Sequence, residues 1–193
     1  MAEEKKQKLS GLKYWLDFVW EITKIVIISL AIIIPIRYFL IQPFFVQGAS
    51  MEPNFLDGDY LIVDEISYRF EVPQRGDVII FRYPLDQSEF FIKRVIGLPG
   101  ETIKIQDGRV FIYNQENPQG VILNEAQYLP DVYTAGDMEI VLKAGEYFVL
   151  GDNRGSSSDS RRWGVLPQNL IIGKAWIRAW PVSRVKVLEN QTN

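Results

Sequence analysis

The chain has 193 residues, a formal net charge of -3 at pH 7, and neither histidine nor cysteine. This length is sufficient for one domain with a hydrophobic core. The absence of histidine excludes Ser-His and Cys-His catalysis, and the absence of cysteine excludes thiol nucleophiles, disulfides and thiolate metal sites. The sequence has no carboxylate cluster with the spacing of an all-oxygen metal site, so we expect neither a metal nor a cofactor. The mild negative charge argues against a nucleic-acid partner.

The N-terminal region combines a lysine-rich start with an apolar stretch. Four lysines lie within residues 5–13, whereas Arg37 is the only basic residue between Lys24 and Arg69. Lys24 and Arg37 enclose 12 uncharged residues, fewer than the roughly 20 that cross a bilayer. We therefore expect a single transmembrane helix at residues 20–40, with these two cationic side chains reaching toward opposite interfaces.

The lysine asymmetry predicts how this helix is oriented. Basic residues accumulate on the cytoplasmic side, so we expect residues 1–19 in the cytoplasm. Residues 44–193 are then an extracytoplasmic domain at the plasma (inner) membrane. Trp20 and Tyr38 are aromatic residues that fit the two interfaces. A cleaved signal peptide and a buried amphipathic helix remain as alternatives, although the region lacks a small-residue cleavage site.

After about residue 45 the pattern predicts β-structure. Short runs rich in branched and aromatic residues, including DYLIVDEI, DVIIFRY, EFFIKRVI and EYFVLGD, are separated by Gly, Pro, Asp and Asn. Their spacing of about ten residues favours antiparallel sheets folded into a sandwich or a partly open barrel. The expected fold class is therefore mainly β, behind one N-terminal helix. Residues 114–143 are less regular, and we expect them to leave the sheet.

A serine that directly follows the apolar region is a candidate nucleophile. Ser50 lies in the stretch FFVQGASMEPNF, and in a chain without histidine its proton needs another acceptor. In EFFIKRVI, strand alternation places Lys93 on one face with Phe91 and Val95. Burial there would lower the pKa of the lysine, and a neutral amine accepts a proton from a serine hydroxyl. The alternative is a solvent-exposed Lys93 and an ordinary loop serine.

A polar stretch, GDNRGSSSDSRRWG at residues 151–164, follows the predicted strand EYFVL. Its turn formers and hydroxyls predict a loop. Asp159 and Arg161 carry the charges to fix this loop as an ion pair, and a serine within it has the chemistry to orient a buried amine. The alternative is a solvated connection.

Four motifs, in the same order along the chain, resemble the type I signal peptidases, the bacterial leader peptidases of the Ser-Lys class. They are QPFFVQGASMEPNFLDGD, PQRGDVIIF, FIKRVIGLPGE and GDNRGSSSDSRRWG, and they follow the N-terminal apolar segment. The resemblance covers most of the chain. It implies a membrane-anchored serine endopeptidase whose mostly antiparallel β domain has an apolar surface against the lipid bilayer. It also implies the substrates, which are exported preproteins cut after a small-x-small (A-x-A) motif.

The resemblance assigns roles to individual residues. It implies Ser50 as the nucleophile, Lys93 as the general base and Ser157 as a hydroxyl that orients the lysine amine. The family's supporting ion pair and structural turn match Asp159, Arg161, Asp152 and Asn153. The positions that line the family's two small side-chain pockets match Phe44, Val46, Met51, Phe55, Phe91 and Ile92. Core packing is the alternative for Phe55 and Ile92.

Two positions depart from the family's usual pattern. Asn54 stands in place of a threonine, and an asparagine still caps or turns the chain. Gly48 stands where some members have a serine that helps to bind the oxyanion. We expect the oxyanion to rest on backbone N–H groups, chiefly that of Ser50, with Gly48 allowing close approach.

Two other functions remain open beside that of a signal peptidase. One is another Ser-Lys protease, such as a self-cleaving repressor-type enzyme or a conjugative maturase. The other is an inactive, membrane-anchored β module that binds peptides. Contact between the Ser50 hydroxyl and the Lys93 amine at hydrogen-bond distance favours an enzyme.

Overall fold

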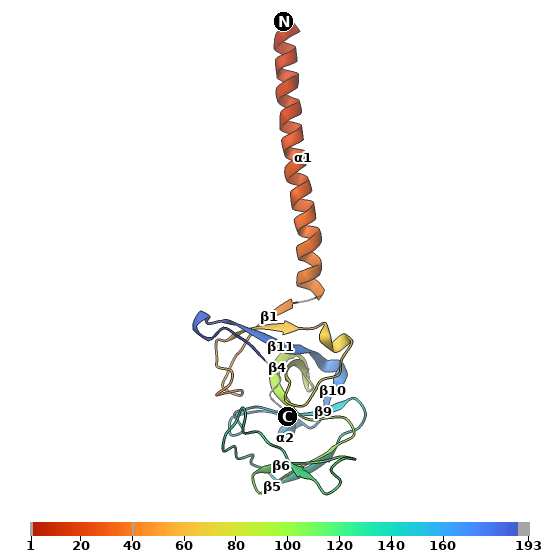
Figure 1. Cartoon of the computed structure of the whole chain (residues 1–193), viewed down its shortest axis with the longest axis vertical. Helices are drawn as coiled ribbons and strands as arrows, with labels where there is room; N and C mark the ends of the chain where they lie inside the picture. The colour runs from red at the N-terminus through yellow and green to blue at the C-terminus, as the bar shows by residue number, and fades with distance from the viewer. Residues whose placement is uncertain (1, 40, 189–193) are drawn as a thin grey trace. The chain divides into compact units, whose positions relative to one another are not determined.

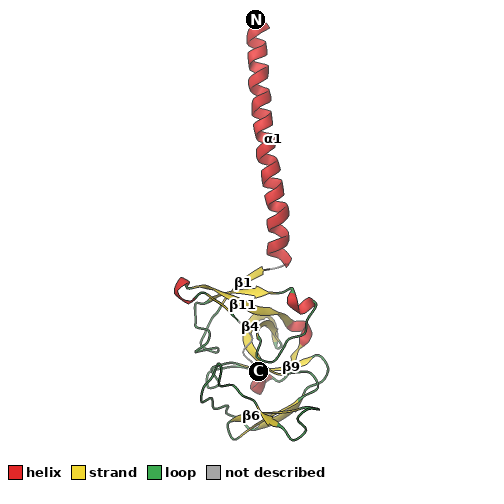
Figure 2. Cartoon of the chain, viewed as in Figure 1, coloured by secondary structure: helices red, strands yellow, loops and turns green. Residues whose placement is uncertain are grey.

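A computed structural model describes the backbone of residues 2–39 and 41–188 and the side chains of residues 14–34 and 42–188. The chain divides into two compact units, residues 1–40 and residues 41–193. The first unit contains the helix α1 (Ala2–Phe39), and the second contains the strands (Figures 1 and 2).

Helix α1 lies where the sequence predicts a helix, but it begins well before residue 20. Its apolar side chains between residues 25 and 34 are about half exposed, for example Ile25 at 58% and Ile34 at 57%. Among the side chains that the structure describes, no helical stretch is both long and apolar enough to cross a membrane. The predicted span of residues 20–40 runs past residue 34, so its last part lies outside the described side chains.

The second unit consists of two antiparallel sheets. In the larger sheet the strand order is β1–β2–β11–β3–β4–β9–β10, with β12 paired to β11. In the smaller sheet the order is β7–β6–β5–β8. All pairings between described strands are antiparallel, which confirms the predicted mainly β, mostly antiparallel fold.

The strands are short, as the sequence runs predict, except for β4 and β11. Those of the larger sheet are β1 (Ile41–Phe45), β2 (Tyr60–Asp64), β3 (Val78–Tyr83), β4 (Asp86–Gly97), β9 (Glu146–Leu150), β10 (Leu166–Pro167), β11 (Ile171–Trp180) and β12 (Lys186–Val187). Those of the smaller sheet are β5 (Thr102–Gln106), β6 (Arg109–Tyr113), β7 (Val121–Ile122) and β8 (Met138–Val141). Short helical turns are η1 (Ser67–Arg69), α2 (Ser160–Trp163), η2 (Gln168–Leu170) and η3 (Val182–Arg184).

Residues 114–143 contribute no described strand to the larger sheet, in keeping with the expected excursion. Instead, β7 and β8 from this segment pair with β6 and β5. A hydrophobic cluster joins the two sheets, with Ile96 and Phe148 from the larger sheet packed against Ile103 and Ile112 from the smaller one. The excursion therefore belongs to a second layer of structure that packs on the larger sheet.

Strand β4 changes its partner along its length. Strand β3 pairs with it from Asp86 to Arg94, whereas β9 pairs along the opposite edge only from Arg94 onward. On that opposite edge, residues 86–93 have no partner among the described strands. Strand β1 likewise pairs with β2 alone among the described strands. Both free edges offer backbone hydrogen-bonding groups to an added strand.

Candidate active site

The two candidate residues of the dyad, Ser50 and Lys93, lie in contact. Ser50 is in the turn after β1, and Lys93 is in β4. The Lys93 Nζ atom donates to Ser50 Oγ at 2.8 Å and to the carbonyl oxygen of Ile92 at 2.7 Å. The ring of Phe91 lies close by, with its centroid 5.3 Å from Nζ. This hydroxyl–amine contact is the geometry that favours an enzyme over a peptide-binding module.

The amine of Lys93 is nearly removed from solvent, with 3% of the residue exposed. Burial lowers its pKa from 10.5 to about 8, while the charges of Asp159 and Asp152 act in the opposite direction. The neutral form, which can accept a proton, is therefore accessible near neutral pH. The inward orientation that strand alternation predicts for this lysine is present in the structure.

The backbone of the Ser50 turn is held by Asn153. The Asn153 N–H donates to the Ser50 carbonyl at 3.1 Å, and the Asn153 side-chain amide donates to the Ala49 carbonyl at 3.0 Å. Beneath the turn, Met51 and Phe55 are buried in a hydrophobic cluster. The hydrogen bonds of Asn153 and the packing of Met51 and Phe55 hold the backbone of the turn and leave the Ser50 side chain in contact with Lys93.

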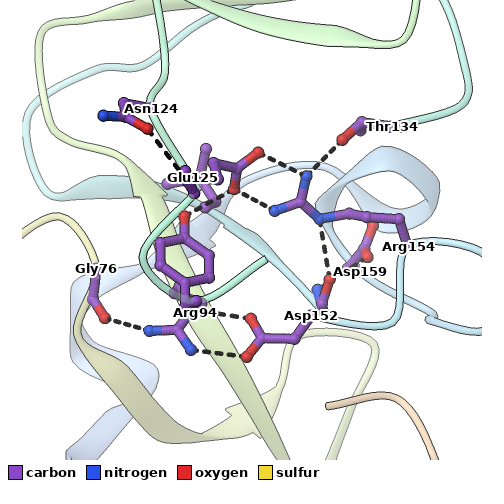
Figure 3. Close-up of polar contacts among 12 residues, drawn as sticks. Gly76, Arg94, Asn124, Glu125, Thr134, Asp152, Arg154 and Asp159 are labelled. Atoms are coloured by element: carbon purple, nitrogen blue, oxygen red, sulfur yellow. Dashed lines mark hydrogen bonds and ion pairs between the residues drawn. The ribbon is translucent and has the colours of Figure 1, made fainter. Parts of the chain in front are cut away.

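Asp152 forms a buried polar contact behind the dyad. Arg94 donates to both carboxylate oxygens, from Nε at 2.8 Å and from Nη2 at 2.6 Å (Figure 3). Asn54 Nδ2 donates to the same carboxylate at 2.8 Å and to the Tyr128 carbonyl at 3.0 Å. An amide nitrogen carries two hydrogens whereas a threonine hydroxyl carries one. The asparagine that replaces the family's threonine therefore bridges two acceptors, a role that its position in the sequence did not reveal.

Asp159 is fully buried and is paired with Arg161. The guanidinium donates to the carboxylate from Nε at 2.8 Å and from Nη2 at 2.9 Å, and the Gly151 N–H adds a third bond at 3.1 Å. Burial alone would raise the pKa of Asp159, but these hydrogen bonds and the charge of Arg161 hold it below its usual value. The two residues thus form the expected ion pair inside the loop of residues 151–161.

Ser157 lies at the junction between this loop and the Ser50 turn. A Cβ atom at Gly151 would be 2.2 Å from Ser157 Oγ and 2.5 Å from the Ser50 carbonyl, so only glycine permits this approach. Among the described residues, Ser157 Oγ makes no hydrogen bond of good geometry, although it lies near enough to Asp159 to lower the pKa of that carboxyl. The hydrogen bonds of Lys93 likewise do not include Ser157. The orienting role of Ser157 stays a prediction.

A cleft of about 610 Å³ opens beside Ser50 and Lys93. Four of the expected substrate positions line it, namely Phe44, Val46, Phe91 and Ile92. Met51 and Phe55 instead lie behind it, with 0% and 3% of each residue exposed. Sequence reasoning did not select several further lining residues, which are Phe45, Gln47, Glu89, Phe90 and Ser158. Phe45, Glu89 and Phe90 lie in β1 and β4, next to expected substrate positions. They would have been found by asking which neighbouring residues share the two free strand edges.

The backbone near Ser50 includes N–H groups with and without an acceptor among the described residues. Gly48 has a φ of +83°, a conformation that favours glycine, and its N–H donates to Asp57 Oδ1 at 2.7 Å. A Cβ atom at Gly48 would meet nothing within 4 Å, so this side of the glycine is open. The Ser50 N–H donates to no acceptor within the part of the chain that the structure describes. The oxyanion role of that N–H stays a prediction.

Comparisons with known proteins agree with this geometry. The family described as "Signal peptidase, peptidase S26" matches residues 19–180. Signal peptidase I of Leptolyngbya laminosa is 42% identical over 166 residues, which is 82% of this chain and 78% of that protein. A probable signal peptidase I-1 of Synechocystis sp. is 38% identical over 176 residues, 87% of this chain and 86% of that protein.

Among solved structures, a signal peptidase I from Enterococcus faecalis is 32% identical, covering 54% of this chain and 97% of that one, with a TM-score of 0.44. The sequence relationships alone are sufficient to assign the family. The chain is a serine endopeptidase, and it belongs to the signal peptidase family, peptidase S26. The resemblance read from the four motifs is thereby confirmed.

Replacing Lys93 by methionine should stabilise the fold at neutral pH. The lysine pKa falls from 10.5 to about 8 on folding, a penalty of roughly 3 kcal/mol while both states are protonated. This penalty is fully present below pH 8 and fades as pH rises to 10.5, because in that range the unfolded chain keeps a proton that the fold has lost. Urea unfolding should therefore show Lys93→Met more stable than the unaltered protein by about 2–3 kcal/mol at pH 7, and by much less at pH 10.

Lys104→Met, in β5 of the smaller sheet, is the matched control because Lys104 is not buried. Its effect on the free energy of unfolding should be small. An effect of Lys93→Met that is the same at pH 7 and pH 10 would contradict the lowered pKa of the buried amine.

Proposed function

We propose that the chain is a membrane-anchored endopeptidase that removes signal peptides from exported preproteins by cutting after a small-x-small (A-x-A) motif. The proposed nucleophile is Ser50, and the proposed general base is Lys93. The observation that carries the proposal is the 2.8 Å contact between the Ser50 hydroxyl and a lysine amine that is 3% exposed. Membership of the signal peptidase family supports signal-peptide removal as the reaction.

The contact supports a sequence of proton transfers. As Ser50 Oγ attacks the scissile carbonyl carbon, the neutral Lys93 amine takes the hydroxyl proton. The oxyanion of the tetrahedral intermediate is stabilised by backbone N–H groups, including that of Ser50. The Lys93 ammonium then returns the proton to the leaving amine. A water molecule, deprotonated by the same amine, hydrolyses the acyl-enzyme and restores Ser50.

The two free strand edges support the way in which a substrate binds. Strand β1 and residues 86–93 of β4 both contribute to the cleft beside the dyad. An extended peptide added to such an edge forms backbone hydrogen bonds and turns alternate side chains toward the protein. The residue before the cut and the residue two places earlier would thus enter the cleft. The residue between them would point away from it.

The membrane anchor belongs to the same proposal. Helix α1 carries the lysine-rich start and the apolar stretch that predict a span with a cytoplasmic N-terminus, which would place the β unit outside the plasma membrane. In the β unit, aromatic and branched side chains on β11, η3 and β12 are exposed, including Trp180 at 55% and Val182 at 70%. Apolar surface of this kind suits contact with a lipid bilayer.

Removal of either member of the dyad should abolish cleavage. Ser50→Ala and Lys93→Ala should each lower kcat on the order of 10⁴-fold or more. Lys93→Arg should fail equally, because a guanidinium stays charged and accepts no proton. In the unaltered enzyme kcat/KM should rise with pH toward a plateau above about 8. The assay is cleavage of a model preprotein in detergent, with sequencing of the new N-terminus.

Lys104→Arg provides the control for lysine replacement in a strand, and it should cleave normally. Ser157→Ala should have a milder effect than either dyad variant. Substantial cleavage by Lys93→Arg would remove the general-base role.

Two substrate series should report the side-chain selectivity of the cleft. Leucine at the residue before the cut, or two places earlier, should slow cleavage because it overfills a small site. Overpacking costs about 1–3 kcal/mol, which is roughly 5- to 150-fold in rate. Leucine at the middle position should be accepted.

A variant of the enzyme also tests the side-chain selectivity of the cleft. Phe44→Ala should enlarge the cleft and reduce the penalty for leucine, whereas Phe111→Ala in β6 should leave it unchanged. Equal cleavage of all three leucine substrates by the unaltered enzyme would contradict an A-x-A specificity.

The orientation of the anchor should be visible in spheroplasts. Protease added from outside should degrade the β unit, whereas an epitope placed at the N-terminus should be protected until the membrane is lysed. The lysine asymmetry is the reason for this expectation. Protection of the β unit in intact spheroplasts would refute the orientation.

A further inference from the structure

A further buried ion pair lies between Glu125 and Arg154, outside the dyad (Figure 3). Each residue is 6% exposed. Arg154 Nη1 donates to Glu125 Oε2 at 2.9 Å, and Nη2 donates to Oε1. The hydroxyl of Thr134 also accepts a bond from Nη1. Glu125 and Thr134 come from the excursion at residues 114–143, so the pair ties that excursion to the loop of residues 151–161.

The arginine side of the pair leads directly to the dyad. Arg154 Nε donates to the Gly151 carbonyl at 3.1 Å, and the Arg154 carbonyl accepts a bond from Arg161 Nη2 at 2.7 Å. Gly151 is the residue that packs between the Ser157 side chain and the Ser50 carbonyl. Arg154 therefore fixes the point where the loop touches the Ser50 turn.

The glutamate side of the pair reaches the opposite half of the site. The Tyr128 hydroxyl donates to Glu125 Oε1 at 2.7 Å, and the guanidinium of Arg94 lies 4.0 Å from the centroid of the Tyr128 ring. Arg94 follows Lys93 in β4. The Tyr128 carbonyl accepts a bond from Asn54, which belongs to the turn that carries Ser50. Tyr128, held by Glu125, thus contacts the neighbours of both proposed catalytic residues.

We propose that Glu125 and Arg154 are positioning residues, which hold Ser50 and Lys93 in contact and keep water away from the lysine amine. This inference rests on the proposed catalytic function of that dyad. A buried ion pair adds little net stability, because desolvation of the two charges offsets their attraction. A bidentate pair with further hydrogen bonds does fix geometry closely, and a displacement of about 1 Å at a reacting centre costs on the order of 100-fold in rate.

The test is Glu125→Gln in the full chain, assayed by preprotein cleavage in detergent. The amide keeps the shape of the carboxylate and loses its charge. We expect kcat to fall about 10- to 100-fold with little change in KM, because neither Glu125 nor Arg154 lines the cleft. The ascending limb of the pH profile should move above about 8. Water that reaches the Lys93 amine weakens the effect of burial, which lowers its pKa, while the charges of Asp159 and Asp152 still raise it. Arg154→Lys, which keeps the charge and loses the bidentate contact, should have an intermediate effect on both readouts.

The matched control is Glu101→Gln. Glu101 is also 6% exposed and is paired with Arg75 at 2.6 Å, at the base of the smaller sheet. This control should lower the temperature of unfolding and leave kcat and the pH profile unchanged. All variants are compared at temperatures below their unfolding transitions. If Glu125→Gln does not fold, Arg154→Lys alone tests the positioning role.

Ser50→Ala in the same assay separates the two proposals. If Ser50→Ala is inactive while Glu125→Gln or Arg154→Lys keeps the kcat and pH profile of the unaltered enzyme, the positioning role is wrong and the catalytic proposal stands. If Ser50→Ala remains active, both are wrong. A selective fall in kcat together with the displaced pH profile supports the positioning role.

Discussion

The site depends on keeping one lysine amine out of water. Lys93 is 3% exposed, and its burial disfavours the ammonium form by an amount that two nearby carboxylates only partly offset. A protein rarely tolerates such a group without compensation, and here the compensation is geometric rather than ionic. The amine has two hydrogen-bond acceptors, Ser50 Oγ and the Ile92 carbonyl, and neither carries a charge. Because a serine hydroxyl can also donate, it can bond to the lone pair of a neutral amine in place of accepting from an ammonium. The surroundings therefore do not force the protonated state.

The two acids near the lysine amine, Asp152 and Asp159, are each paired with an arginine. Asp152 and Asp159 would each favour a charged lysine, yet each is already engaged by a guanidinium, Asp152 by Arg94 and Asp159 by Arg161. The positive charge of each guanidinium opposes the attraction that its carboxylate exerts on the amine. What remains is a scaffold of paired charges that fixes the backbone around Ser50. The network of Figure 3 extends this scaffold into the excursion at residues 114–143 through Glu125 and Thr134.

Local patterns in the sequence predict the strands and the inward face of β4. They offer Ser50 and Lys93 as candidates, and the resemblance to the signal peptidases selects the catalytic interpretation over a loop serine and an exposed lysine. Each of the local predictions rests on short-range rules, namely alternation along a strand and the chemistry of adjacent residues. The features that sequence reasoning missed are contacts between distant segments. The bridge made by Asn54 spans 98 residues to Asp152, and the Glu125–Arg154 pair joins a loop to an excursion that had no recognisable pattern. The early start of α1 was also missed, because its polar N-terminal residues lack the apolar period that was used to place the helix.

The position of β11 in the larger sheet has a consequence for the time at which the enzyme becomes active. Strands β1 and β2 bring Ser50, strands β3 and β4 bring Lys93, and β11 is hydrogen-bonded between these two hairpin-like halves. During synthesis β11 emerges after both halves, so a nascent chain contains the proposed nucleophile and base before the strand between the two halves has been made. The loop of residues 151–161 also emerges late. The candidate site is thus assembled only after β11 has joined the sheet. Strand order alone therefore delays the moment at which Ser50 and Lys93 come into contact.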